Sequence, residues 1–131
     1  MKVLLDTHAL IWLFEGNEEL TQSAKFEIQN PENKIFVSIV SFWEIAIKIS
    51  IGKLEMDFSM EQLYQLVNSN GIEILPIKVE HTYALRGMPY FHKDTFDRLL
   101  ISQALNEEMS IVSCDSILDK YLMENQITRI W

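Results

Sequence analysis

The sequence predicts an α/β protein with a central, mainly parallel β-sheet that is covered by helices on both faces. Short apolar runs with β-branched residues alternate with segments of helical periodicity along the 131 residues. Such an alternation favours parallel strands joined by helical crossovers. The length fits one domain over residues 1–131, and a hydrophobic content of 48% is ordinary for a globular protein.

The first half of the chain predicts two strands and four helices. Short apolar runs predict the strands at residues 2–5 and 34–38. Apolar residues at helical spacing predict helices at residues 7–14, 20–29, 39–51 and 58–70. Gly16 and Gly52 end the first and third of these helices, and Pro31 stops the second because proline disfavours helix in the preceding residue. Ser59 and Gln62 have the spacing of a capping box and begin the fourth helix.

The second half of the chain predicts three strands and three helices. The strands lie at residues 72–75, 110–113 and 127–130. The helices lie at residues 79–86, 95–108 and 116–123. Pro76 halts the first of these strands, and Gly87 and Pro89 break the first helix. Residues 88–95 form a loop rich in aromatic and polar groups.

The composition predicts a cytoplasmic protein without a membrane span. No apolar run approaches the ~20 residues that a span requires, and the N-terminus shows no export signal. The single cysteine, Cys114, excludes an internal disulfide and fits a reducing compartment. The net charge of −8 does not favour a nucleic-acid partner, because affinity for phosphate comes largely from Lys and Arg. A divalent cation bound by clustered acids would reverse the local field, so an RNA substrate remains open.

Four acidic residues are the candidate site. Asp6 and Asp115 each follow a predicted strand, and Glu44 and Asp97 lie early in predicted helices. The carboxyl ends of parallel strands and the adjoining helix starts meet at one edge of an open α/β sheet, where ligands bind. Four carboxylates gathered there repel one another unless a cation lies between them, and oxygen ligands suit Mg²⁺ or Mn²⁺.

Helix capping is the alternative interpretation of three of these acids. Asp6 and Asp115 each precede a helix and have the residue type of an N-cap. Asp94 has the position of an N-cap for the helix at 95–108, with Asp97 at the third helical position, where an acid favours the positive helix end. Asp94 and Arg98 are also spaced for an i,i+4 ion pair.

Glu44 has two interpretations that depend on where its helix begins. If Ser41 is the cap, Ser41 and Glu44 form a capping box. If Ser38 is the cap, Glu44 lies inside an apolar helix and needs a partner, either a metal or Lys48 one turn later.

The chain resembles PIN domains, specifically the VapC toxin nucleases, over nearly its whole length. The segments that carry the resemblance are Leu4–Leu10, Val37–Lys48, Asp94–Ile101 and Ile111–Asp115. The resemblance implies a three-layer α/β/α sandwich in which four acids hold one or two Mg²⁺ or Mn²⁺ ions and hydrolyse RNA with an activated water. It assigns those roles to Asp6, Glu44, Asp97 and Asp115, with Asp94 as the alternative third acid. It also implies a small antitoxin partner and a homodimer.

Other polar residues near these segments are weaker candidates for contacting RNA. They are Thr7, Lys48, His92, Lys93, Arg98 and Ser113. Two other functional classes remain. A phosphatase with Asp6 as nucleophile is disfavoured, because the position of its usual partner acid holds His8. A non-catalytic interaction module with the same fold is disfavoured by the complete set of four acids.

Overall fold

The computed structural model describes residues 1–131 and contains one five-stranded sheet, in which every neighbouring pair of strands is parallel. The strands are β1 (Lys2–Leu5), β2 (Lys34–Ser38), β3 (Glu73–Leu75), β4 (Ser110–Val112) and β5 (Arg129–Ile130). Their order is β3-β2-β1-β4-β5, with β1 at the centre. The predicted parallel α/β class is therefore confirmed, and the strands differ from the predicted ranges only at their ends.

Seven α-helices connect and cover the strands. They are α1 (Thr7–Glu15), α2 (Gln22–Gln29), α3 (Ile39–Ser50), α4 (Met60–Ser69), α5 (Val79–Gly87), α6 (Thr95–Glu107) and α7 (Asp119–Leu122). None of the helices is both long enough and apolar enough to cross a membrane.

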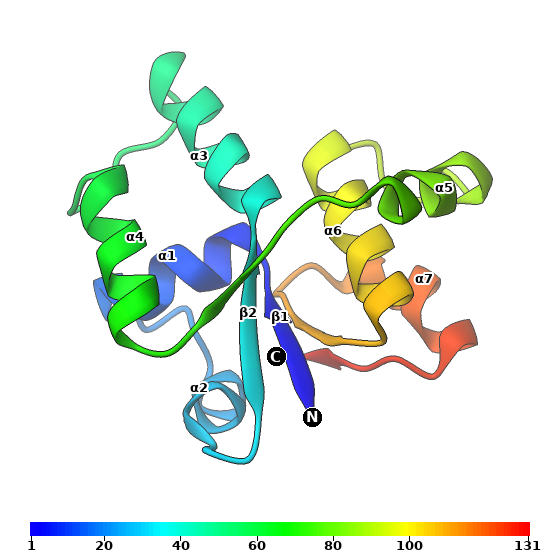
Figure 1. Cartoon of the computed structure of the whole chain (residues 1–131), viewed down its shortest axis with the longest axis horizontal. Helices are drawn as coiled ribbons and strands as arrows, with labels where there is room; N and C mark the ends of the chain where they lie inside the picture. The colour runs from blue at the N-terminus through cyan, green and yellow to red at the C-terminus, as the bar shows by residue number, and fades with distance from the viewer.

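Alternation along the strands divides the core into two layers. Val3, Leu5 and Val37 belong to one buried cluster, which includes residues of α1, α2 and α4. Leu4 and Phe36 belong to a second cluster, which includes residues of α6 and α7. Successive strand side chains point to opposite faces, so the apolar run of β1 contributes to both layers. Figure 1 shows the result, with α1, α2 and α4 on one side of β1 and β2 and with α6 and α7 on the other.

The predicted helix at 116–123 is the main difference from the sequence analysis. The segment consists of a 3₁₀ turn at Ser116–Leu118, the short α7 and a second 3₁₀ turn at Met123–Asn125. The first turn tightens because the Asp115 side chain accepts from Ile117 N, while Leu118 N donates to the Asp115 carbonyl. Bonds over three residues are typical of 3₁₀ geometry.

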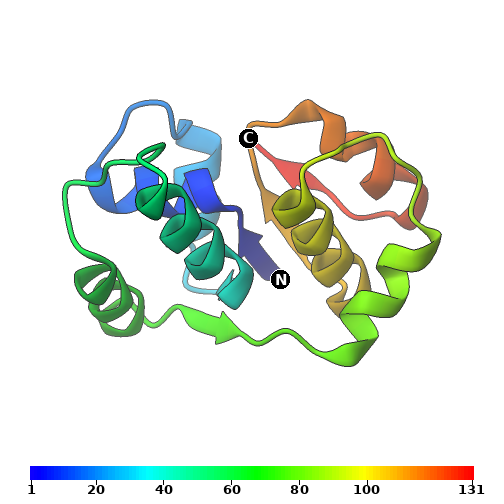
Figure 2. The same cartoon turned by 90° about the horizontal axis from the view of Figure 1, so that it is seen from above.

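The order of the strands places a switch point next to β1. The chain proceeds from β1 outward through β2 and β3, then returns to the other side of β1 with β4 and β5. Ligands of open parallel sheets bind outside the carboxyl ends of the strands at such a point. Asp6 follows β1 there, and Asp115 lies beyond the end of β4. In Figure 2, α3 and α6 lie on either side of β1.

Candidate metal centre

Asp6 is a buried carboxylate at the carboxyl end of the central strand. Its Oδ1 accepts from Ala9 N at 2.8 Å and so caps α1, as the capping interpretation predicts. The residue is only 7% exposed. Burial raises the pKa of Asp6 and the charge of Glu44 adds to this, against hydrogen bonds from Ser113 and Ala9. Asp6 is therefore a desolvated acid whose charge interacts with that of Glu44.

Glu44 lies inside α3, because Ser38 and not Ser41 is the helix cap. The Ser38 side chain accepts from Val40 N at 3.0 Å. Glu44 is 2% exposed, and each of its oxygens has a partner. Thr7 Oγ1 donates to Oε1 at 2.6 Å, and Lys48 Nζ donates to Oε2 at 2.5 Å. The ion pair with Lys48 that the sequence offered as an alternative is thus formed.

Asp97 carries a second carboxyl group whose pKa is strongly raised. The Asp94 side chain accepts from Asp97 N at 2.9 Å, so Asp94 caps α6 and places Asp97 at its third position. The pKa of Asp97 is raised to about 7, first by burial and then by the charges of Asp94 and Glu44, against an opposing effect of His92. Asp97 therefore lies where negative charge is in excess.

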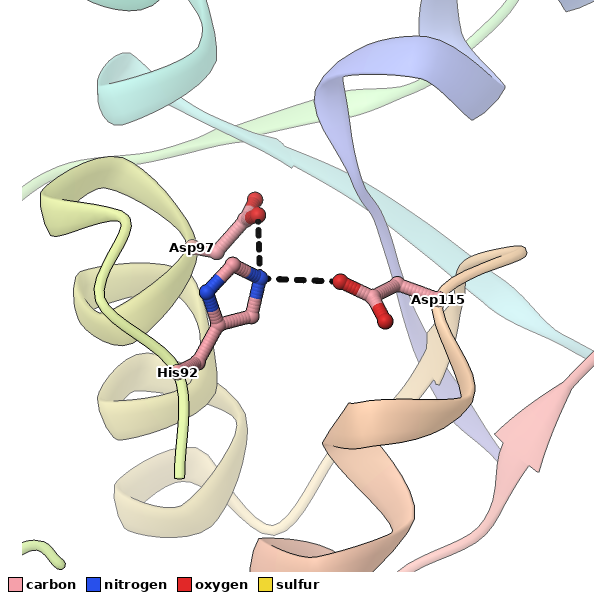
Figure 3. A group of neighbouring side chains, drawn as sticks. All are labelled: His92, Asp97 and Asp115. Carbon is pink, nitrogen blue, oxygen red and sulfur yellow. Dashed lines mark hydrogen bonds and ion pairs between the residues drawn. The ribbon is translucent and has the colours of Figure 1, made fainter. Parts of the chain in front are cut away.

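His92 connects the two sides of the site. Its Nε2 lies 3.0 Å from Asp97 Oδ2 and 2.8 Å from Asp115 Oδ2 (Figure 3). One ligand atom from each of the three residues lies within 4.8 Å of the others. Asp97 comes from α6 and Asp115 from the segment after β4, so two elements separated in sequence present their carboxylates to one point.

The tautomer of His92 follows from its second ring nitrogen. Asp94 N donates to His92 Nδ1 at 3.1 Å, so Nδ1 is an acceptor and carries no proton. The ring proton is then on Nε2, which donates toward Asp97 and Asp115. The imidazole N–H therefore lies between the carboxylates of Asp97 and Asp115.

The capping bonds and the candidate site use different oxygens. Asp115 Oδ1 accepts from Ile117 N, whereas Oδ2 faces His92. Asp6 Oδ1 accepts from Ala9 N. Each capping bond uses one oxygen of its carboxylate, and a carboxylate can accept through both of its oxygens. The capping interpretation and the metal interpretation are therefore compatible.

The donor set fits a hard divalent cation. The negative charges of four acids raise the pKa values of Asp6, Lys48 or Asp97. These acids are Asp6, Glu44, Asp94 and Asp97. Burial lowers the pKa of Lys48, but its hydrogen bond to Glu44 and the charges of these acids raise it overall. Lys48 is the one ammonium that directly pairs with these acids. Carboxylate oxygens in excess over cations are the ligands that Mg²⁺ and Mn²⁺ prefer, and Asp97, Asp115 and Asp6 are the residues that would hold one.

Three residues expected to contact RNA are buried. Thr7 is 4% exposed and holds Glu44, whereas Ser113 is 1% exposed and its Oγ accepts from Asp115 N. Arg98 is 6% exposed, forms no ion pair with Asp94 and donates instead to the carbonyls of Met88 and Pro89. These geometries assign positioning roles to all three side chains. Lys93, in contrast, is exposed.

Tyr121 is a positioning residue that the sequence analysis missed. Its hydroxyl donates to the Pro89 carbonyl at 2.7 Å and accepts from His92 N at 2.8 Å. It therefore fixes the loop that carries His92. No local pattern around residue 121 signals this contact, which joins residues 29 apart in the sequence.

The fold and the site define an α/β protein with clustered carboxylates at the switch point of a parallel sheet. The chain belongs to the PIN domain family, whose model matches residues 3–121. A comparison with curated protein sequences finds no match.

Several solved structures share the fold. A chain of VapBC2 from Rickettsia felis, solved bound to a DNA fragment from its promoter, has a TM-score of 0.68 and 16% identity, with 98% of each chain covered. VapBC-1 from nontypeable Haemophilus influenzae has a TM-score of 0.67 and 16% identity, covering 98% of this chain and 96% of that chain. A toxin–antitoxin complex from Klebsiella pneumoniae has a TM-score of 0.56 and 19% identity, with 87% of each chain covered.

Proposed function

We propose that this protein is a Mg²⁺- or Mn²⁺-dependent endoribonuclease and the toxin of a toxin–antitoxin pair in the cytoplasm. The observation that carries the proposal is the convergence of Asp97 and Asp115 on one point. The charges of the buried Asp6 and Glu44 also act on the Asp97 carboxyl group. Family membership supports nuclease chemistry, and the VapBC structures with the same fold support the toxin role.

The residues of the chain divide into ligands and positioning groups. Asp6, Asp97 and Asp115 would hold the cation, and a divalent ion there would supply Lewis-acid chemistry toward water and the scissile phosphate. Glu44 is fixed by Thr7 and Lys48 and sets the charge and orientation at the site. The Ser113 hydroxyl orients Asp115 by accepting a hydrogen bond from the Asp115 backbone N–H.

The proposed toxin role also predicts two protein partners. We propose that a small antitoxin covers the carboxylate edge in the resting cell and that the toxin forms a homodimer. Light scattering of the free chain and of the chain co-expressed with the neighbouring short reading frame tests both assemblies. A free chain that is monomeric at all concentrations contradicts the homodimer.

Cleavage of RNA in the presence and absence of metal tests the activity. The purified chain, freed of antitoxin, is expected to cut a structured RNA with Mg²⁺ or Mn²⁺ and to stop when EDTA is added. Asp97→Asn, purified identically, controls for contaminating ribonuclease. Cleavage that continues in EDTA, after metal removal has been verified, would falsify the metal mechanism. An absence of cleavage under every metal condition favours the alternative, a non-catalytic interaction module.

A further inference from the structure

Two consecutive aromatic side chains are exposed in the loop that leads into His92. Tyr90 is 79% exposed and Phe91 is 47% exposed. They belong to the segment between α5 and α6, which runs along one end of the molecule in Figure 2. Large aromatic rings are normally placed in a core or an interface, so two adjacent exposed rings require an explanation.

Both rings are held from one side by groups of this chain. The guanidinium carbon of the buried Arg98 lies 4.0 Å from the centroid of the Tyr90 ring. Phe91 packs edge-on against Tyr121, with centroids 5.1 Å apart, and Lys120 Nζ lies 5.6 Å from its centroid. A ring fixed on one side and exposed on the other is a preorganised surface for stacking, because its orientation is already set before a ligand arrives.

The two rings are flanked by surface clefts with positive charge. One cleft, of about 430 Å³, is lined by Arg86, Phe91 and Lys120, together with one acid, Glu124. The other, of about 470 Å³, also includes Arg86 and is lined by Tyr90, Lys93 and Arg98. Four basic residues and one acidic residue therefore line the pair of clefts.

This concentration of cations is unusual for the chain. The protein has a net charge of −8 and 11 Lys and Arg residues. Four of the 11, namely Lys34, Lys48, Lys78 and Arg129, are paired with carboxylates, and Arg98 is buried. The six others are Lys2, Lys25, Lys53, Arg86, Lys93 and Lys120. Half of these free cations line the two clefts.

We propose that Tyr90, Phe91, Arg86, Lys93 and Lys120, here called the aromatic ridge, bind a single-stranded segment of RNA. Grooves that combine cations with exposed aromatic rings bind single strands, because the cations contact phosphates and unpaired bases stack on the rings. A duplex keeps its bases stacked internally and has no free face for Tyr90 or Phe91. The positive charge complements a polyphosphate, whereas most of the surface of this acidic chain repels one.

The position of the ridge links it to the carboxylates. Phe91 is followed directly by His92, whose Nε2 contacts Asp97 and Asp115. The exposed rings and the imidazole that contacts these acids therefore belong to the same loop. The inference rests on the proposed ribonuclease function and names the residues outside the carboxylate cluster that bind its substrate.

Binding without cleavage tests the ridge. Fluorescence anisotropy of a labelled 12-nucleotide single-stranded RNA is measured with the wild-type chain in EDTA, with a duplex of the same sequence as the comparison. The wild type is expected to bind the single strand about tenfold more tightly than the duplex. The double variant Tyr90→Ala/Phe91→Ala is expected to bind the single strand at least about tenfold more weakly. Tyr64→Ala, at a 52% exposed tyrosine of α4, is the matched control and is expected to bind normally.

A rescue variant separates stacking from folding. Tyr90→Trp/Phe91→Trp retains both stacking faces, so its affinity is expected to remain within about threefold of the wild type. Charge reversal in Arg86→Glu/Lys93→Glu/Lys120→Glu is expected to weaken binding and flatten its dependence on salt, whereas Lys2→Glu is not. Melting scans verify that each variant is folded.

The outcomes distinguish this inference from the proposed activity. The proposed role of the aromatic ridge is overturned if the folded double alanine variant binds as tightly as the wild type, even if the chain cleaves RNA. It is also overturned if the wild type binds single strand and duplex equally. Ridge-dependent binding of single-stranded RNA by a chain that never cleaves it overturns the nuclease and leaves the ridge standing.

Discussion

His92 Nε2 lies 2.8 Å from Asp115 Oδ2 and carries the ring proton toward that oxygen, because Asp94 N–H donates to Nδ1. The same nitrogen lies 3.0 Å from Asp97 Oδ2. The imidazole therefore satisfies two carboxylates that we assign to the metal. In this tautomer Nε2 has no lone pair to offer a cation, so His92 and the cation compete for the same oxygens.

Removal of this imidazole is expected to strengthen metal binding. His92→Ala abolishes the hydrogen bonds that a cation must replace at Asp97 and Asp115, so its Kd for Mn²⁺ should fall severalfold in isothermal titration. Phe26→Ala, at an exposed residue of α2, is the control and should not change the Kd. Weaker binding by His92→Ala would instead make the imidazole a metal ligand and contradict the tautomer.

Loss of any one of the four acids is expected to reduce RNA cleavage severely while preserving the fold. Four variants should each lower the rate by roughly 100-fold or more: Asp6→Asn, Glu44→Gln, Asp97→Asn and Asp115→Asn. The three aspartate variants remove charge from a proposed ligand, and Glu44→Gln removes charge that sets the orientation at the site. Asp94→Asn should be milder, because asparagine keeps a side-chain oxygen that can accept from Asp97 N and Asp94 is not among the residues proposed to hold the cation. Initial rates at fixed Mn²⁺ measure the series. If Asp94→Asn abolished cleavage while Asp97→Asn retained it, the third ligand would be Asp94 and not Asp97.

The metal-free protein is expected to lose stability as the pH rises from about 4 to about 7. The pKa of Asp97 is raised from 3.8 to about 7, first by burial and then by the charges of Asp94 and Glu44. The folded state thus holds a proton that the unfolded state has released, and this favours folding at low pH only. The contribution is fully present below pH 3.8 and is lost as the pH passes 7.

Asp97→Asn separates this effect from other titrations. In EDTA at pH 8 the variant should be more stable than the wild type by roughly 1–2 kcal/mol, given about 1.4 kcal/mol per pKa unit and solvent screening of a side chain that is 30% exposed. The gain should vanish near pH 4. Asp57→Asn, at an exposed acid outside the site, should show no such trend. Urea titrations at four pH values decide the matter, and a gain that is constant with pH contradicts it.

Arg98 is expected to contribute to stability through the loop that it anchors. Arg98→Met leaves the carbonyls of Met88 and His92 without this donor, so the free energy of unfolding should fall by about 1–3 kcal/mol. The exposed Arg86→Met should cost about 0.5 kcal/mol or less. Equal losses in urea titrations of the two variants would contradict the anchoring role.

Most of the fold was predictable because its signals are local. Apolar runs, glycine and proline stops and the capping box of Ser59 and Gln62 each act within a few residues, and the capping box is present in the structure. The parallel sheet follows from alternation alone. The prediction of one continuous helix after Asp115 was wrong. The Asp115 side chain accepts from Ile117 N and tightens the first turn, and helical periodicity does not reveal that hydrogen bond.

The candidate site was only partly predictable. The strand ends bring Asp6 and Asp115 to one edge, as the topology requires. The sequence left the cap of α3 open between Ser38 and Ser41, and the structure decides for Ser38. The contact of His92 with both carboxylates and the anchoring of its loop by Tyr121 depend on packing between residues distant in sequence. No pattern within a single segment encodes such contacts.

Thermal unfolding with and without Mn²⁺ tests most directly whether the clustered carboxylates hold a divalent cation. A ligand that binds only the folded state at a hundred times its Kd adds about 2.7 kcal/mol, which raises the Tm of a domain of this size by several degrees. Millimolar Mn²⁺ is expected to raise the Tm of the wild type and of Asp57→Asn equally, and to raise that of Asp6→Asn much less. No rise in the wild type, or the same rise in Asp6→Asn, would contradict the metal centre.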